Sequence, residues 1–163
     1  MIMDGGGATQ VCRFRTAAPG APHTKRHDPK PGRPAKGRPV FNVASLELPP
    51  TAESVPAARQ LVGTVTEHLP RRAREAAELI ASELVTNSVI HAQTPFTVFA
   101  AVDEDSVELV VSDHAGWTSD HAGEGSGHGL LLVGLLAAEW AAVMEADGKR
   151  VWARLEVDDV PTY

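Results

Sequence analysis

The sequence predicts an α+β fold of two layers, in which a mixed, mostly antiparallel sheet carries its helices on one face. Three observations favour this class. Segments with helical and with strand-like patterns alternate in the order strand, two helices, two strands, loop, helix, two strands. The strands in each consecutive pair are separated by only a short turn, which favours antiparallel pairing. The length of 163 residues fits one domain with some chain left over.

The chain divides by composition at about residue 40. Residues 1–40 contain six prolines, three consecutive glycines and few large apolar residues. Such a segment cannot bury enough apolar surface to offset its ordering entropy. We therefore expect a disordered basic tail over residues 1–40 and a folded domain over residues 41–163.

The charges are also divided at this boundary. Residues 1–40 hold eight of the 15 Lys and Arg residues and two of the 21 acidic residues, so residues 41–163 keep seven basic and nineteen acidic groups. An acidic domain is poorly suited to nucleic-acid phosphates and better suited to a basic protein surface. The tail is either a solvated extension or a basic arm for nucleic acid or an acidic partner.

The single cysteine, Cys12, lies in the predicted tail and excludes both an internal disulfide and a cysteine-based metal site. No run of about 18 apolar residues is present, and the N-terminus lacks the pattern of a secretory signal. We therefore expect a cytoplasmic protein without a membrane segment.

The first strand is expected over residues 41–48, where Pro49 and Pro50 stop it. Thr51 is the expected N-cap of a helix that continues to His68. After Pro70, helical spacing predicts a second helix from Arg71 to about His91.

The next two strands are expected at residues 96–102 and 106–112, joined by an acidic turn at residues 103–105. The second strand delivers Asp113 at its C-terminal end. The periodicity then stops in a glycine-rich loop over residues 114–129.

An apolar helix is predicted over residues 130–138, with its amino end at the last glycines of this loop. Two further strands, at residues 140–146 and 150–157, flank a turn at Asp147-Gly148.

A polar stripe lies inside the apolar face of the second helix. At about 100° per residue, Glu83, Asn87 and His91 fall within an arc of roughly 80°. The apolar residues on or beside that arc are Ala76, Leu79, Ile80, Leu84 and Ile90, whereas Val85 and Val89 fall on the side expected to face solvent. Buried carboxylates and amides need partners, so the stripe should face a polar ligand, a metal ion or ordered water.

The glycine-rich loop before a helix start is a plausible anion site, because the first helical amides have no intrahelical partner. Glycines also occur in loops that bind nothing. The loop is accompanied, however, by a carboxylate at a strand end and an Asn oxygen on a helix. Together these three features indicate a nucleotide-binding site. One Asn ligand suffices for Mg²⁺, which keeps waters and bridges substrate phosphates.

Residues 41–157 resemble the GHKL (histidine kinase-like, Bergerat fold) ATPase superfamily, and more closely the anti-sigma factor serine/threonine kinases of actinobacteria. Four blocks in order carry the resemblance: Glu83-Leu-Val-Thr-Asn87-Ser-Val-Ile-His91-Ala92, Val-Ser-Asp113, Gly127-His-Gly129-Leu-Leu-Leu-Val133 and Gly148-Lys149-Arg-Val-Trp152.

The resemblance implies a role for each matching residue. Asn87 would hold Mg²⁺, Asp113 would bind the adenine amine, and Glu83 would be the general base. His91 would touch the phosphates or fill the pocket wall. The implied ATP-binding residues are Asn87, His91, Asp113, Gly116, Gly125, Gly127, His128, Gly129 and Leu130. The loop histidines His114, His121 and His128 have no metal-ligand spacing.

The implied function is that of an ATP-binding anti-sigma regulator. It would phosphorylate a serine or threonine of an anti-sigma factor antagonist, sequester a sigma factor, or both, and relatives of this type are often homodimers. The chain departs from the family pattern at Ala115 and Arg150, where the family has a glycine and a small threonine. It also has no Lys or Arg between Asp113 and Lys149. These departures leave an alternative, a catalytically inactive nucleotide-binding interaction module.

Overall fold

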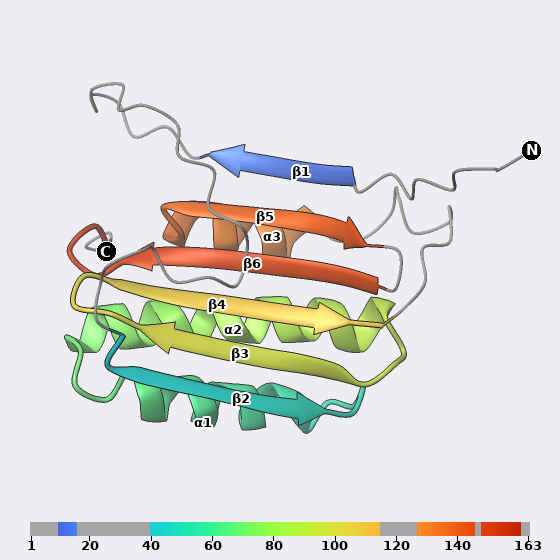
Figure 1. Ribbon diagram of the computed structural model, residues 1–163, viewed down its shortest axis with the longest axis horizontal. Coiled ribbons are helices and arrows are strands. Elements are labelled where there is room, and N and C mark those ends of the chain that lie inside the picture. Colours follow the sequence, from blue (N-terminus) through green and yellow to red (C-terminus); the bar gives the residue numbers. More distant parts are fainter. Residues whose placement is uncertain (1–9, 16–39, 115–126, 146–147, 161–163) are drawn as a thin grey trace, which may run out of the picture.

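The computed structural model describes residues 10–15, 40–114, 127–145 and 148–160. The described chain forms three helices and a sheet of six strands (Figure 1). In chain order the elements are β1 Gln10–Arg15, β2 Asn42–Leu48, α1 Ser54–Val65, α2 Arg71–His91, β3 Phe96–Val102, β4 Ser106–Asp113, α3 Gly127–Leu136, β5 Glu139–Glu145 and β6 Gly148–Glu156.

The strand order in the sheet is β1-β5-β6-β4-β3-β2. Figure 1 shows the three helices behind this sheet, on the same face. The α+β class is therefore confirmed. The sheet was expected to be mixed, but all five pairings between the described strands are antiparallel. The short connections between β3 and β4 and between β5 and β6 account for much of this, because a connection of so few residues cannot join parallel strands.

The turn between β3 and β4 is held by one aspartate side chain. The Oδ1 atom of Asp103 accepts hydrogen bonds from the backbone N–H groups of Asp105 (3.0 Å) and Ser106 (2.7 Å) and from the Ser106 hydroxyl (2.9 Å). An aspartate that binds the backbone two or three residues on stabilises a turn. The acidic turn predicted at residues 103–105 is therefore confirmed.

The start of α1 differs from the prediction. Thr51 is not the N-cap, because the helix begins at Ser54 and the cap position, Glu53, makes no side-chain cap hydrogen bond. Thr51 instead belongs to a preceding turn, in which its carbonyl accepts the Ser54 N–H at 3.1 Å. The pKa of the Glu53 carboxyl is lowered, first by a hydrogen bond from its own backbone and then by the Thr51 side chain.

Helix α3 is also displaced from its predicted range of residues 130–138. It begins at Gly127, so the glycine block forms its first turn, and it ends at Leu136. The N–H of Ala138 donates to the carbonyl of Arg154 at 2.8 Å instead of continuing the helix. This bond links the end of α3 to β6 just before β5 begins.

The prediction of disorder over residues 1–40 is wrong for residues 10–15. These residues form β1, which pairs along the whole of β5 from Gln10↔Met144 to Arg15↔Glu139. The free edge of β5 offers unpaired N–H and C=O groups, and Val11 and Phe14 are residue types that favour strands. Residues 1–9 and 16–39 lie outside the described residues, so for them the expectation stays a prediction.

The main core lies between the helices and the sheet. Its fully buried members include Val62 on α1, Ile80 and Leu84 on α2, Leu109 on β4 and Leu155 on β6. A smaller cluster lies on the other face of the sheet, where Val110, Ala141 and Trp152 are buried and Phe99 packs against them. Within the described helices, none is long and apolar enough to cross a membrane.

The buried face of α2 is rotated relative to the predicted apolar face. Val85 is fully buried although it was expected to face solvent, whereas Leu79 is 41 % exposed and Ile90 58 % exposed. Helix α1 packs against α2, with Gly63 facing Glu78. Val85 lies about two helical turns after Glu78 and therefore on the same side of α2. The side occupied by Leu79 and Ile90 faces outward.

The rotation predicts different effects for two identical substitutions. Leu84→Ala removes a side chain that is 1 % exposed and should lower the free energy of unfolding by about 2–5 kcal/mol. Leu79→Ala removes an exposed side chain and should cost less than about 1 kcal/mol. Urea unfolding followed by circular dichroism measures both, and equal losses would contradict the observed orientation of α2.

Candidate functional site

The topology brings the C-terminal ends of α2 and β4 and the first turn of α3 to the same end of the sheet. Helix α2 ends at His91, a few residues before Phe96, and Phe96 pairs with Asp113 at the end of β4. Helix α3 ends beside β5 at the opposite end of the sheet, and its ten residues span about 15 Å. Its first turn therefore lies toward Asp113. Helix α2 contacts α3, β4 and β6.

The three polar residues of α2 lie at the edge of its buried face. Glu83, Asn87 and His91 are each half-buried, between buried positions such as Leu84 and Ser88 and the exposed Ile90. Their side chains are thus neither enclosed in the core nor fully in solvent. This is the setting expected of groups that meet a ligand at the rim of a packed helix.

Asp113 is the buried carboxylate of the site. It is 7 % exposed, and its Oδ1 accepts a hydrogen bond from the backbone N–H of Lys149 at 3.3 Å. A carboxylate accepts up to about four hydrogen bonds, so Asp113 can hold both Lys149 and a ligand amine. The prediction that β4 ends with this aspartate is confirmed.

Gly148 makes this arrangement possible. A Cβ atom on Gly148 would lie 1.8 Å from the backbone oxygen of Asp113 and 3.0 Å from the Cα of His114. Both contacts are with backbone, which cannot rotate away as a side-chain end can. Only glycine lets β6 begin this close to the end of β4.

The remaining predicted residues divide into two groups. Gly127, His128 and Gly129 occupy the first turn of α3, where backbone N–H groups lack intrahelical partners, and Leu130 is half-buried against the core. Gly116 and Gly125 lie outside the described residues, as does His121.

Lys149 was missed by the sequence analysis. On β6, Val151, Ala153 and Leu155 belong to the core beneath the helices, and the side chains of a strand alternate between faces, so Lys149 projects toward the same face. Arg150 projects to the other face, where its Nε donates to the hydroxyl of Ser112 at 3.3 Å. The alternation of β6 was the available signal, because it separates Lys149 from Arg150.

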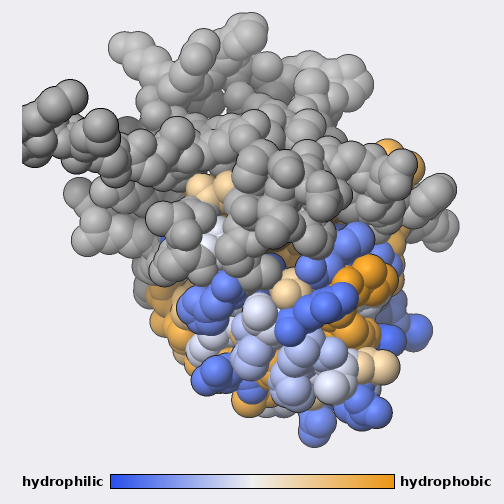
Figure 2. Space-filling view, turned by 90° about the vertical axis from the view of Figure 1, so that its right-hand side faces the viewer, coloured by the Kyte–Doolittle hydropathy of each residue, from blue (hydrophilic) through white to orange (hydrophobic). Residues whose placement is uncertain are grey.

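Figure 2 shows this end of the molecule, because it views the right-hand side of Figure 1, where β4 points. Below the residues of uncertain placement, hydrophobic patches interrupt a mainly hydrophilic surface.

Comparison with models of known protein families shows which family the chain belongs to. The model of the histidine kinase-like ATPase domain matches residues 48–155, from the end of β2 to the end of β6. The chain belongs to this family. Among the curated proteins compared, none matches the chain.

The chain is thus an ATP-binding domain of the histidine kinase-like class. Its described residues fit the nucleotide chemically. The Thr94 hydroxyl oxygen is buried with no hydrogen-bond partner among the described residues, at the same end of the sheet as Asp113. A buried polar atom of this kind is normally satisfied by a ligand or ordered water.

The described residues also fit a metal ion that is held mainly by phosphates. They contain no group of three or more His, Cys, Asp or Glu side chains that could hold a metal ion. The amide oxygen of Asn87 is a ligand type that Mg²⁺ accepts, and Mg²⁺ at nucleotide sites uses few protein ligands.

The close approach at Gly148 predicts a strong effect of one methyl group. Gly148→Ala should push the start of β6 away from Asp113, lower the free energy of unfolding and weaken ATP binding. The matched control is Gly63→Ala on α1, where the added Cβ would meet only the end of the Glu78 side chain, at 2.9 Å. Thermal unfolding and calorimetry with ATP measure both effects, and unchanged ATP binding in Gly148→Ala would contradict the role of this contact.

Proposed function

We propose that this chain is an ATP-dependent anti-sigma regulator with serine/threonine protein kinase activity. It binds ATP with Mg²⁺ and phosphorylates a hydroxyl group of an anti-sigma factor antagonist, or sequesters a sigma factor. The proposal is supported by the family of the domain and by the burial of its polar groups: Glu83 and Asn87 are half-buried on α2, which contacts β4 and α3, and Asp113 is buried at the end of β4.

The roles in binding follow from the chemistry of each group. Asp113 accepts a hydrogen bond from the exocyclic amine of adenine while the Lys149 N–H orients its carboxylate. The amides of Gly127 to Leu130 bind phosphate oxygens, helped by the positive end of the α3 dipole. Asn87 would offer one oxygen to Mg²⁺, and this ion would supply positive charge beside the phosphates. His91 lines the wall of the pocket.

Glu83 is the proposed general base, because its carboxylate lies one helical turn before Asn87 on the same side of α2. It takes the proton of the substrate hydroxyl while that oxygen forms a bond to the γ-phosphorus. The bond between the γ-phosphorus and the bridging β–γ oxygen breaks, and ADP leaves with the electron pair.

The role of Asn87 predicts a magnesium-specific defect. Calorimetry on the whole chain should show that ATP binds more tightly with Mg²⁺ than with EDTA. In Asn87→Ala, detectable binding of the magnesium complex should be lost, because its single protein ligand is removed. Thr86→Ala is the neighbouring control and should bind as the unchanged chain does. An Asn87→Ala variant that still responds to Mg²⁺ would exclude this role.

The role of Glu83 predicts separate effects on binding and transfer. Glu83→Gln should bind ATP normally and lose transfer of labelled phosphate to an antagonist protein by about 10²–10⁴-fold, the usual contribution of a general base. Glu75→Gln on the exposed side of α2 is the control and should retain transfer. A panel of antagonists that accept no phosphate from the unchanged chain would remove the kinase half of the proposal.

One observation favours the alternative function, a nucleotide-binding interaction module without catalysis. Phosphoryl transfer depends on positive charge near the γ-phosphate, and the chain between Asp113 and Lys149 has no Lys or Arg. Lys149 itself adjoins Asp113, at the adenine side of the proposed site. Equal affinity for a partner with and without ATP, unaffected by Glu83→Gln, would support this module.

A further inference from the structure

One hydroxyl at the Asp113 end of the sheet is buried without a hydrogen-bond partner among the described residues. It is the side-chain oxygen of Thr94, in the segment between α2 and β3. Arg154 Nε is the other described side-chain atom in this state, and it still lies 3.0 Å from a Glu156 carboxylate oxygen as an ion pair. Burying a polar group without a partner costs stability. The Thr94 hydroxyl therefore indicates a ligand or an ordered water at this position.

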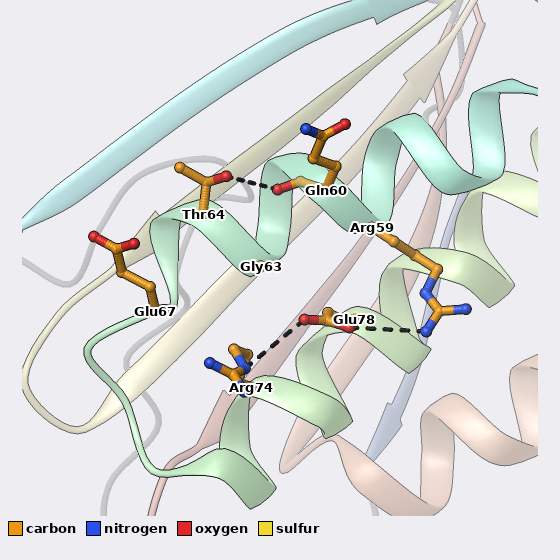
Figure 3. A pocket seen from close by; sticks show the side chains of 7 residues that line it. All are labelled: Arg59, Gln60, Gly63, Thr64, Glu67, Arg74 and Glu78. Carbon is orange, nitrogen blue, oxygen red and sulfur yellow. Dashed lines mark hydrogen bonds and ion pairs between the residues drawn. The ribbon is translucent and has the colours of Figure 1, made fainter.

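Two threonine hydroxyls elsewhere in the domain are satisfied by the chain itself. On α1, the Thr64 hydroxyl donates to the carbonyl of Gln60 at 2.9 Å, as Figure 3 shows. The Thr66 hydroxyl, directly after α1, belongs to a buried residue and donates to the carbonyl of Val62 at 2.7 Å. In both cases the acceptor lies one helical turn back. Neither hydroxyl needs a ligand, so Thr66 is a matched comparison for Thr94.

The position of Thr94 in the chain places it close to Asp113. On β3, Phe96 and Val98 belong to the core beneath the helices, and on β4 so does Val111. Side chains alternate along a strand, so Asp113 lies on the same face as Val111. Phe96 pairs with Asp113, and Thr94 is two residues before Phe96. Two residues span at most about 7 Å and paired Cα atoms are about 5 Å apart, so the two Cα atoms of Thr94 and Asp113 lie within about 12 Å.

The backbone on both sides restricts the Thr94 side chain. Among the described residues other than glycine, only Gln93 has a positive φ, 52°, which turns the chain directly after α2. Glycine is the usual residue there, and another residue keeps this conformation only where the surrounding structure fixes it. Pro95 favours an extended Thr94, with its side chain on the same face as that of Phe96. The β-branched side chain of threonine also has few rotamers. The hydroxyl is thus oriented before a ligand binds.

The base that suits Asp113 also needs a hydrogen-bond donor. In adenine, the exocyclic amine that would donate to the carboxylate lies next to the ring nitrogen N1, which is an acceptor. A threonine hydroxyl can donate to such an atom. Guanine has the opposite pattern, a carbonyl oxygen that would face the carboxylate and an N1–H group. Strand β6, which pairs with β4 at Asp113, contains no serine or threonine, so it cannot supply the hydroxyl.

We propose that Thr94 is a second residue that recognises the adenine base, with its hydroxyl donating to N1 while Asp113 accepts from the amine. The inference rests on the proposed nucleotide site, to which it adds a residue that selects adenine. It explains why a buried hydroxyl is kept without a partner in the nucleotide-free chain.

The first test compares two threonine-to-valine substitutions in the full chain. Thr94→Val should weaken binding of ATP with Mg²⁺ by about three- to tenfold, the usual loss for one hydrogen bond. It should not lower the melting temperature of the nucleotide-free chain, because the removed hydroxyl has no partner there. Thr66→Val should show the opposite pattern, a lower melting temperature and unchanged ATP affinity. Calorimetry and thermal unfolding measure these effects, and a purely structural Thr94 would behave as Thr66 does.

The second test removes the partner atom from the ligand. In 1-deaza-ATP a carbon replaces N1, so the unchanged chain should bind it about three- to tenfold more weakly than ATP. Thr94→Val should bind the two nucleotides equally, because the contact is already lost. Purine riboside triphosphate, which lacks the amine, should bind more weakly than ATP to both chains, since Asp113 is present in both. Lys149→Met removes the other nearby donor and should keep the preference for ATP over 1-deaza-ATP.

The outcomes separate this inference from the nucleotide site itself. Unchanged ATP affinity in Thr94→Val, or a preference for ATP over 1-deaza-ATP that persists in this variant, would overturn the role of Thr94 alone. Loss of that preference in Lys149→Met would assign the donor to Lys149 and overturn it as well. If the unchanged chain bound no ATP, both the nucleotide site and this inference would be wrong.

Discussion

The packing of α2 against the middle of the sheet is the constraint on which the other features depend. Half of the buried residues of this helix are alanines, at positions 73, 76, 77 and 81, so the helix axis lies close to its neighbours. Ile80 and Leu84 fill the space toward the sheet, and Val85 is covered on the α1 side. A helix fixed in this way cannot rotate without exposing this core. Its polar edge, with Glu83 and Asn87, is therefore held at one orientation relative to β4.

The second structural requirement is the close meeting of β4 and β6. Their pairing continues to Asp113 and Lys149, at the end of the sheet where α2 also ends. Gly148 allows this approach, and the Lys149 N–H donates to the buried carboxylate. A buried aspartate in a fixed orientation is suited to binding one particular amine.

Charge is distributed unevenly over the domain, which holds seven basic and nineteen acidic residues after residue 40. Most acidic groups lie outside the α1–α2 corner, so a basic partner surface meets most of the domain favourably. At this corner the charges are close to balanced, because Arg59 and Arg74 pair with Glu78 and Arg71 pairs with Glu75.

Local signals were sufficient for most element boundaries and for the family. Helix α2 begins directly after Pro70 and ends at His91, so its predicted range of residues 71–91 is confirmed. The predicted range of β3, residues 96–102, is confirmed as well. The motif blocks indicated the histidine kinase-like ATPase class, which the family match confirms. The order and spacing of these blocks can be read from the sequence, because neither depends on which residues are in contact. The roles of the individual residues remain predictions.

Only the tertiary structure showed which side chains are buried and which elements cover them. Helical periodicity gave α2 an apolar face, but the position of α1 buries Val85 and leaves Ile90 exposed. Strand β1 forms because β5 offers a free edge, a partner more than a hundred residues away in the chain. The hydrogen bond from the Lys149 N–H to Asp113 likewise joins segments that are distant in the sequence. The sequence by itself determined the local elements and the family, because both follow from neighbouring residues; the burial of each face and the meeting of polar groups depend on long-range packing, which only the folded chain defines.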